Sequence, residues 1–337
     1  MLDGRGAILG IPEQGVQLQI WQAIVLGLVE GITEYLPISS TGHLILASAL
    51  MGLDKPEVKQ SIDAFNIVVQ GGAILAVAGL YWPRIVQMLR GLAGKDAAGL
   101  RLVINLVVAF LPAAVLGKML DDWIEAKLFY VGPVLAAVVL GGVYMIAVDR
   151  YSRARLAHRA EAQEKEEAGL DIDSLTPARA FVIGLLQCVA MWPGTSRSMM
   201  TITGGMLVGL RPVAAAEFSF LLGLPTLGAA TLYKLYKNLS HARNGGGQNL
   251  FEQLGTGAVV IGLVVATLSA ALAVKWLVGF LNKHGLTPFA WYRFGLAVVI
   301  FGLWQAGMLA IAPAGPLPAS TPPVERAMLV PHPTETM

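Results

Sequence analysis

The chain has 337 residues, of which 55% are hydrophobic and 14% charged, and its formal net charge is +2 at pH 7. Soluble domains carry about 25% charged residues, so this chain lacks the polar surface needed to face water on all sides. Long apolar segments between short charged loops predict an all-α polytopic membrane protein. The net charge by itself says nothing about nucleic acid, and no nucleic-acid partner is expected. A single cysteine, Cys188, excludes an internal disulfide.

The first apolar stretch in the chain, residues 20–53, is interrupted. A helical run is followed by the cluster Pro-Ile-Ser-Ser-Thr-Gly at 37–42 and then by a second short apolar run. Proline cannot continue the helical hydrogen-bond ladder, and serine or threonine is well suited to start the next helix. Irregular backbone at membrane depth is tolerated only where protein or a water-filled cavity surrounds it. We therefore predict a re-entrant helix–loop–helix hairpin.

Residues 178–210 repeat this pattern, with the cluster Pro-Gly-Thr-Ser-Arg-Ser at 193–198. They predict a second re-entrant hairpin whose tip meets the first inside the protein. The remaining apolar segments are uninterrupted and close to the ~20 residues that cross a bilayer. We predict six full transmembrane helices, at about 65–82, 102–120, 131–148, 217–235, 256–278 and 292–311.

The charged loops predict the orientation in the membrane. The loop 83–101 and the segment 149–177 are rich in lysine and arginine, which places both in the cytoplasm by the positive-inside rule. They lie two spans apart, as a shared side requires. Lys275, Lys283 and Arg293 border a further loop on the same side. Because each hairpin returns to its own side, both termini are expected outside.

The chain contains an internal repeat. A shift of 157 residues superposes Gly27 on Gly184 and Ser39 on Ser196. An odd number of spans separates the two hairpins, so the halves run in opposite directions and form an inverted-topology repeat. We expect a single integral-membrane domain, 1–311, with halves at about 20–148 and 178–311, a cytoplasmic linker at 149–177 and a Pro-rich, disordered tail at 312–337.

Two glutamates, Glu30 and Glu34, stand in the first interrupted stretch. Their four-residue spacing puts both carboxylates on one helical face, about 6 Å apart. A carboxylate within a membrane segment costs several kcal/mol and usually faces a cavity with a partner. The pair is suited to general acid–base chemistry or to holding a divalent cation, Mg²⁺ or Ca²⁺. The alternative is a structural hydrogen-bonded pair.

The sequence Ser39-Ser40-Thr41-Gly42-His43 directly follows the first break. Hydroxyl groups and backbone N–H groups at the start of a helix form an anion site. His43 lies one turn into this second half-helix and could transfer a proton or act as a nucleophile. Serines in such a position are often only helix caps, but here they accompany two intramembrane carboxylates.

Hydroxyl side chains surround an arginine in the second interrupted stretch. An arginine at an intramembrane helix start needs an anionic counterpart, and its guanidinium fork matches phosphate oxygens. The alternative is a structural salt bridge from this arginine to Glu30 or Glu34. The group consists of Thr195, Ser196, Arg197, Ser198 and Thr201.

These motifs resemble the signature regions of the undecaprenyl-diphosphatase family, also called the bacitracin-resistance family. The resemblance is close at 30–34, 36–43 and 193–198, and extends loosely over about 20–310. It implies hydrolysis of undecaprenyl diphosphate in the bacterial inner membrane, with an active site open to the periplasm. The resemblance also assigns family catalytic positions to Glu30, Glu34, Ser40, His43 and Arg197.

Several questions stay open at the level of sequence. The nucleophile could be Ser40, His43 or water, and a divalent cation is expected without an organic cofactor. The substrate partner is a polyprenyl diphosphate lipid; a homodimer is one of the oligomeric states that the sequence allows. A lipid-phosphate flippase or small-anion transporter built on the same inverted repeat is the alternative function, and a non-catalytic lipid-binding subunit is a third.

Overall fold

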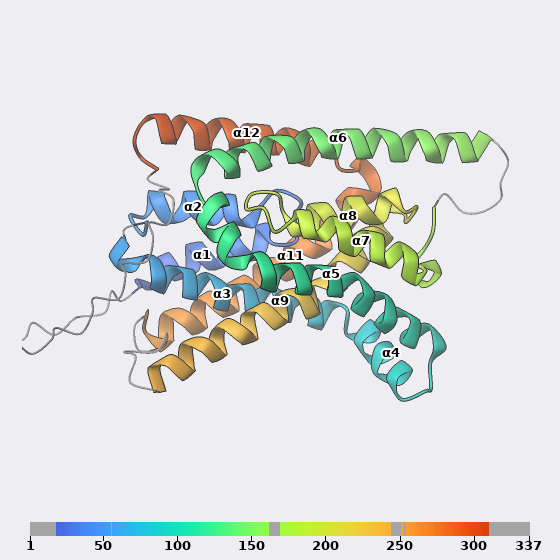
Figure 1. The fold of residues 1–337 in the computed structure, drawn as a ribbon, viewed down its shortest axis with the longest axis horizontal. Coiled ribbons are helices and arrows are strands. Elements are labelled where there is room, and N and C mark those ends of the chain that lie inside the picture. The colour runs from blue at the N-terminus through green and yellow to red at the C-terminus, as the bar shows by residue number, and fades with distance from the viewer. Residues whose placement is uncertain (1–17, 55, 162–168, 244–250, 252–253, 310–337) are drawn as a thin grey trace, which may run out of the picture.

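A computed structural model describes residues 18–54, 56–161, 169–243, 251 and 254–309. Over these ranges the chain is helical apart from short connections, and the six helices long and apolar enough to cross a membrane confirm a multi-pass membrane protein. They run roughly along the horizontal axis of Figure 1. The spans lie in α3 (Pro56–Leu80), α5 (Ala97–Leu128), α6 (Val131–Glu161), α9 (Pro212–Arg243), α11 (Thr256–His284) and α12 (Thr287–Gln305).

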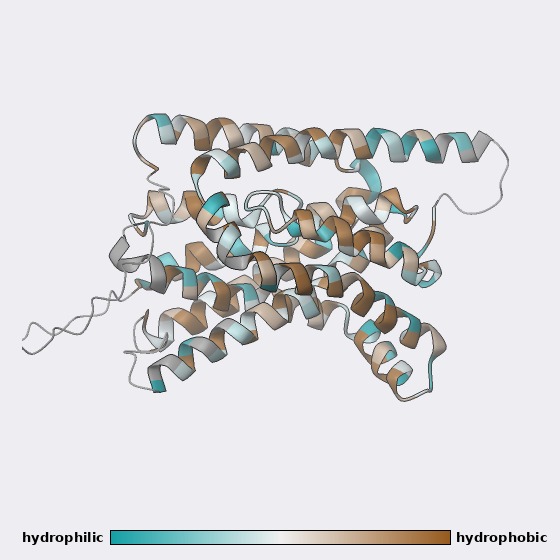
Figure 2. Cartoon of the chain, in the orientation of Figure 1, coloured by the Kyte–Doolittle hydropathy of each residue, from teal (hydrophilic) through white to brown (hydrophobic). Residues whose placement is uncertain are grey.

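Apolar side chains cover the outer faces of these helices. Leu111 on α5, Leu140 on α6 and Leu272 on α11 are among the large hydrophobic residues that stand exposed. Figure 2 shows the same apolar character along the helices. Such a surface suits contact with lipid rather than with water.

Each interrupted stretch forms two short helices around a break. The first comprises α1 (Ile20–Thr33) and α2 (Ser40–Leu50), and the second comprises α7 (Pro177–Val189) and α8 (Arg197–Leu207). At about 1.5 Å per residue, none of the four is long enough to cross a bilayer alone. The predicted positions of both breaks are confirmed.

The backbone of the two interrupted stretches recurs at the interval of 157 residues. Ser39 and Ser196, at the starts of α2 and α8, have φ angles of 76° and 79°. No other non-glycine residue of the described chain has a positive φ. Gly52 and Gly209, just after the two helices, also share a positive φ. The sequence repeat is thus accompanied by equivalent local structure.

Helix pairs approach closely at glycine positions. α1 packs against α11 and α7 against α5. A Cβ atom added at Gly27 would lie 2.6 Å from the carbonyl oxygen of Gly262, and one added at Gly184 would overlap the backbone of Ala109. Small residues let helix backbones approach in membranes, where van der Waals packing drives helix association. These contacts fix the two interrupted stretches against the full-length helices.

One loop expectation was wrong. Most of the 83–101 loop is helical, because Pro83 suits the first turn of the helix α4 (Trp82–Leu92) and Asp96 caps α5 through the N–H of Gly99. A 3₁₀ turn, η1 (Ile172–Ser174), lies within the predicted 149–177 linker. The acidic part of that linker, 162–168, and the predicted tail lie outside the described residues.

The basic segments gather at one end of the molecule. Arg84 at the start of α4 forms a 3.1 Å ion pair with Asp173 of η1. Arg153 of α6 donates to the carbonyl of His284, 2.6 Å away, at the end of α11. In Figure 1, α4 and the C-terminal half of α6 both lie on the right side of the view, below and above the other helices. These contacts place the segments at one end of the molecule, as the predicted shared side of the membrane requires.

We predict that Gly27→Ala destabilises the protein by about 1–3 kcal/mol, as expected for overpacking, because the new Cβ would meet the backbone of α11. Gly79→Ala on α3 is the matched control, since a Cβ there meets nothing within 4 Å. Thermal unfolding in detergent measures both. A Gly27→Ala variant as stable as the Gly79→Ala variant would contradict the packing described.

Candidate active site

Glu30 and Glu34 stand one helical turn apart at the end of α1. The N–H of Glu34 donates to the carbonyl of Glu30 at 2.9 Å, which continues the helical ladder by one residue. Both residues are buried, with exposed fractions of 1% and 6%. Glu30 Oε2 is buried without a hydrogen-bond partner. The chain therefore buries two neighbouring carboxylates, as the spacing predicts, and leaves one of them incompletely satisfied.

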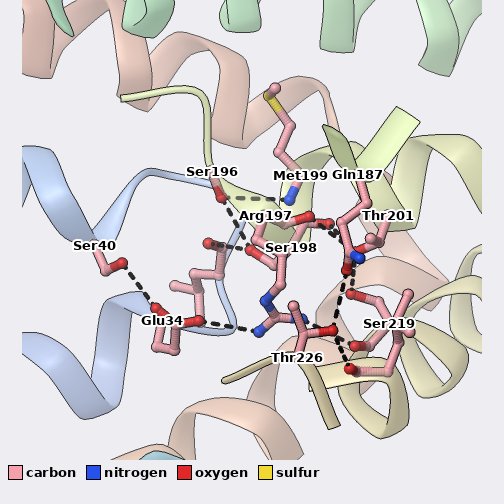
Figure 3. A network of polar contacts seen from close by, with 12 residues as sticks. Glu34, Ser40, Gln187, Ser196, Arg197, Ser198, Met199, Thr201, Ser219 and Thr226 are labelled. Atoms are coloured by element: carbon pink, nitrogen blue, oxygen red, sulfur yellow. Dashed lines mark hydrogen bonds and ion pairs between the residues drawn. The ribbon is translucent and has the colours of Figure 1, made fainter. Parts of the chain in front are cut away.

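Glu34 connects the two interrupted stretches (Figure 3). Its Oε2 accepts a 2.8 Å hydrogen bond from Ser40 Oγ at the start of α2. Its Oε1 accepts from Arg197 Nη2 at 3.0 Å, in an ion pair whose side chains are only 5% and 10% exposed. The salt bridge considered as an alternative from the sequence is therefore present. The same Glu34 carboxylate also accepts a hydrogen bond from a hydroxyl group. In such an arrangement a carboxylate can act as a base toward a nucleophile.

Arg197 is held from several sides. Its Nη1 donates to the carbonyl of Ser219 on α9 at 3.0 Å. The guanidinium carbon lies 5.5 Å from the centroid of the Tyr35 ring. Gly223, one turn after Ser219, leaves room for the guanidinium, because a Cβ there would lie 3.2 Å from it. Arg197 Nε is buried without a partner, so the group retains a free donor.

The serines beside Arg197 form a second link between the breaks of the two interrupted stretches, here called the two tips. Ser198 Oγ donates to the carbonyl of Leu36 in the first break at 2.9 Å. Ser196 Oγ lies 3.0 Å from Ser198 Oγ. Thr201 instead bonds Ser219 Oγ at 2.6 Å, behind the arginine. Ser198 and Arg197 thus connect directly to the first interrupted stretch, whereas Thr201 supports them.

The starts of α2 and α8 combine caps with unusual backbone. Ser39 Oγ accepts from the N–H of Gly42 at 3.2 Å, and Ser196 Oγ accepts from the N–H of Met199 at 3.3 Å. Both serines adopt the left-handed conformation, which costs on the order of 1–3 kcal/mol for a non-glycine residue and clusters at functional sites. Both helices therefore begin at the two breaks, and the N–H groups at a helix start that have no intrahelical partner favour anions.

His43 lies beside this network and not within it. Its Nδ1 is 2.7 Å from the carbonyl of Ser39, so Nδ1 carries the proton. Its Nε2 is 2.7 Å from the hydroxyl of Tyr292 on α12, and the two rings stack with centroids 5.6 Å apart. The contact between Nε2 and the phenol holds the other side of the ring. His43 is thereby oriented by residues that flank the Glu34 network.

The predicted site residues fall into two groups. One network of polar contacts brings together Glu34, Ser40, Ser196, Arg197, Ser198 and Thr201. The other predicted residues lie nearby in the chain but outside that network in the part of the protein described: Glu30, Ser39, Thr41, His43 and Thr195.

Arg293 was wrongly assigned to the border of a loop. α12 begins at Thr287, and Arg293 is fully buried within it. Its guanidinium donates to the carbonyls of Ala137 and Val138 on α6, at 2.9 and 3.0 Å, and to the carbonyl of Gly194 at 2.9 Å. A single arginine therefore fixes the second break to α6. The position of Arg293 inside an apolar run of the sequence was the signal that could have revealed its burial in a helix.

A divalent cation would have few protein ligands here. No group of three or more His, Cys, Asp or Glu side chains suited to a metal occurs among the described residues. Both Glu34 oxygens are engaged, and Glu30 Oε2 is free. Mg²⁺ is commonly held by one or two carboxylates together with substrate phosphates. The residues fit a cation that phosphate oxygens help to bind.

We predict strong coupling between Glu34 and Arg197. Arg197→Met should destabilise the protein by about 3–5 kcal/mol, because it leaves an unpaired carboxylate buried. The double variant Glu34→Gln/Arg197→Met should lose less than the sum of the single variants. Denaturant unfolding in micelles measures the cycle, with exposed Arg90→Met as the control. Additive effects would show that the pair contributes no interaction energy.

The chain is similar to known proteins over most of its length. The family model described as bacitracin resistance protein BacA matches residues 23–299. A protein of Sorangium cellulosum named undecaprenyl-diphosphatase is 43% identical over 84% of this chain and 85% of its own. Undecaprenyl-diphosphatase 2 of Rhodospirillum rubrum is 43% identical over 86% and 96%, and undecaprenyl-diphosphatase of Nitrosomonas europaea is 40% identical over 87% and 97%. The chain therefore belongs to the bacitracin resistance protein BacA family.

Proposed function

We propose that this protein is an undecaprenyl-diphosphatase, which hydrolyses undecaprenyl diphosphate to undecaprenyl phosphate and inorganic phosphate and so recycles the bacterial cell-wall lipid carrier. The family and the names of the relatives support this reaction. The observation that carries the proposal is the buried Ser40–Glu34–Arg197 chain between the two tips. The alternative of a flippase or small-anion transporter is not favoured, because the relatives are named for a phosphatase.

The architecture that we infer has two re-entrant hairpins in an inverted-topology repeat. The recurrence of local structure after 157 residues supports the repeat. The packing pairs support the inversion of the repeat. α1 packs on α11 and α7 packs on α5, and a shift of 157 residues relates α1 to α7 and α5 to α11. Short helices around an irregular break, surrounded by full spans, are typical of such repeats.

The site opens, in this proposal, to the periplasmic side of the bacterial inner membrane. Leu18 and Leu53, at the open end of the first hairpin, pack in one cluster with Leu254 at the start of α11. The basic segments gather at the other end, where Arg155 donates to the carbonyl of Leu207 at the end of α8. The positive-inside rule makes that basic end cytoplasmic, which leaves the first hairpin facing the periplasm.

The proposed reaction is an in-line displacement at the terminal phosphorus. Ser40 Oγ forms the new bond to phosphorus while its proton passes to Glu34 Oε2, and the anhydride bond to undecaprenyl phosphate breaks. Water then releases inorganic phosphate from the serine. The hydrogen bond from Ser40 to Glu34 supports serine over water or His43 as the nucleophile. His43 is placed in this scheme as a proton carrier.

Substrate binding is assigned to the groups around the two helix starts. Arg197 would exchange its contact with Glu34 for phosphate oxygens and offset the charge that develops during transfer. The hydroxyls of Ser39, Thr41, Thr195, Ser196, Ser198 and Thr201 complete the proposed binding region. Mg²⁺ or Ca²⁺, held by Glu30 and Glu34 with the diphosphate, would neutralise further charge; no organic cofactor is required.

Phosphate release from undecaprenyl diphosphate by the purified protein tests the reaction. We expect release by wild type, a loss of at least about 100-fold in Glu34→Gln and about 1,000-fold in Arg197→Ala. Ser40→Ala should abolish turnover, and Ser48→Ala on the same helix should not. Full turnover by Ser40→Ala would assign the attack to water or His43. Folded wild type that releases no phosphate, with or without divalent cations, would overturn the hydrolase.

Tyr292→Phe tests whether the phenol orients His43. Loss of one neutral hydrogen bond contributes about 1 kcal/mol, so kcat should fall about 5-fold while KM stays unchanged. Tyr151→Phe, an exposed tyrosine on α6, is the control. An unchanged kcat in Tyr292→Phe would show that His43 needs no support from the phenol.

A further inference from the structure

An open cavity of about 780 Å³ lies at the basic end of the molecule, between α6, α11 and the start of α12. The part of the cavity on α6 begins twelve residues after Ala137, whose carbonyl accepts a hydrogen bond from Arg293. This separation along the helix is about 18 Å at 1.5 Å per residue. The cavity is therefore separate from the candidate active site. Its lining includes Asp149, Arg150, Arg153, Lys283, His284 and Trp291.

The one carboxylate of the lining is already neutralised. Asp149 is buried and forms a 3.1 Å ion pair with Arg153. It also accepts from the N–H of Leu286 at 3.3 Å and from the hydroxyl of Thr287 at 2.5 Å. Asp149 thus anchors the start of α12 to α6, and it has no capacity left to balance a further cation.

Two cations of the lining have no such partner. Arg150 and Lys283 are exposed, and no ion pair joins either of them to a carboxylate of the described chain. Three cationic side chains against one carboxylate leave the cavity two positive charges in excess, with His284 neutral. A basic pocket between membrane helices attracts anionic lipid headgroups.

An apolar stripe leads along α11 to this cavity. Leu268, Leu272 and Trp276 are exposed at four-residue spacing, so they lie on one face of the helix. The stripe continues through Phe280, whose ring stacks on Trp276 at 4.7 Å and on His284 at 4.5 Å. A soluble anion has no apolar part that could contact this stripe, whereas the acyl chains of a lipid would lie against it.

We propose that this cavity binds the headgroup phosphate of an anionic phospholipid from the leaflet at this end. Arg150 and Lys283 contact the phosphate, and Trp291, exposed on α12, lies at the level of the headgroups as membrane tryptophans do. The acyl chains follow the stripe from Trp276 to Leu268. Inorganic phosphate offers the same charge without the chains, and the test separates the two.

The test uses the full chain in neutral detergent with phosphatidylglycerol or phosphatidylcholine of identical acyl chains. Thermal unfolding midpoints are followed against lipid fraction, and in a separate arm against inorganic phosphate at constant ionic strength. The cavity variant is Arg150→Gln/Lys283→Gln. The matched control is Arg90→Gln/Lys95→Gln, which removes two exposed cations at the same end but outside the cavity.

We expect phosphatidylglycerol to raise the midpoint of wild type more than phosphatidylcholine does. The cavity variant should need about 30-fold more phosphatidylglycerol, since each cation near an anionic surface contributes about 1 kcal/mol and 1.4 kcal/mol is tenfold. The control should respond as wild type does. Equal responses of the cavity variant and wild type, or an equal loss in the control, would overturn the proposal. The proposal would also be overturned if inorganic phosphate raised the unfolding midpoint of wild type as much as phosphatidylglycerol does and the cavity variant lost this shift.

Discussion

The ion pair between Glu34 and Arg197 is the interaction on which the rest of the site depends. Each side chain lies in a segment surrounded by membrane-spanning helices, where an unpaired charge is costly. Their pairing at 3.0 Å joins the break after α1 to the start of α8, although the two residues are 163 positions apart. The two interrupted stretches therefore have to meet tip to tip, and the full spans pack around that meeting point.

The neighbouring residues hold this arrangement without using its charges. Gly27 lets α1 approach α11 through backbone contact, and Gly223 leaves the space that the guanidinium of Arg197 occupies. Arg293 ties the carbonyl of Gly194 to α6. These are positioning contacts: they fix where the breaks lie, while Ser40 bonds Glu34 and Glu30 Oε2 stays buried without a partner.

The two halves share a backbone pattern but differ in chemistry. At the interval of 157 residues, Glu30 corresponds to Gln187, and Ser40 corresponds to Arg197. Gln187 is buried like Glu30, so the environment is retained while the charge is not. One half supplies carboxylates and a hydroxyl, and the other supplies a cation. That division suits a reaction centre, since catalysis needs a base and an anion-binding group on opposite sides of the substrate.

The sequence alone determined the fold class, the six spans, both breaks and the identity of the polar residues, because hydrophobic length and Pro/Ser/Thr clusters are local signals. It predicted that Glu34 and Arg197 could pair but not that Ser40 shares the same carboxylate. Only the tertiary structure revealed that Tyr292 bonds His43 and that Arg293 is buried against α6. Those contacts join residues more than 150 positions apart, and no local pattern encodes which carbonyl or hydroxyl a distant side chain reaches.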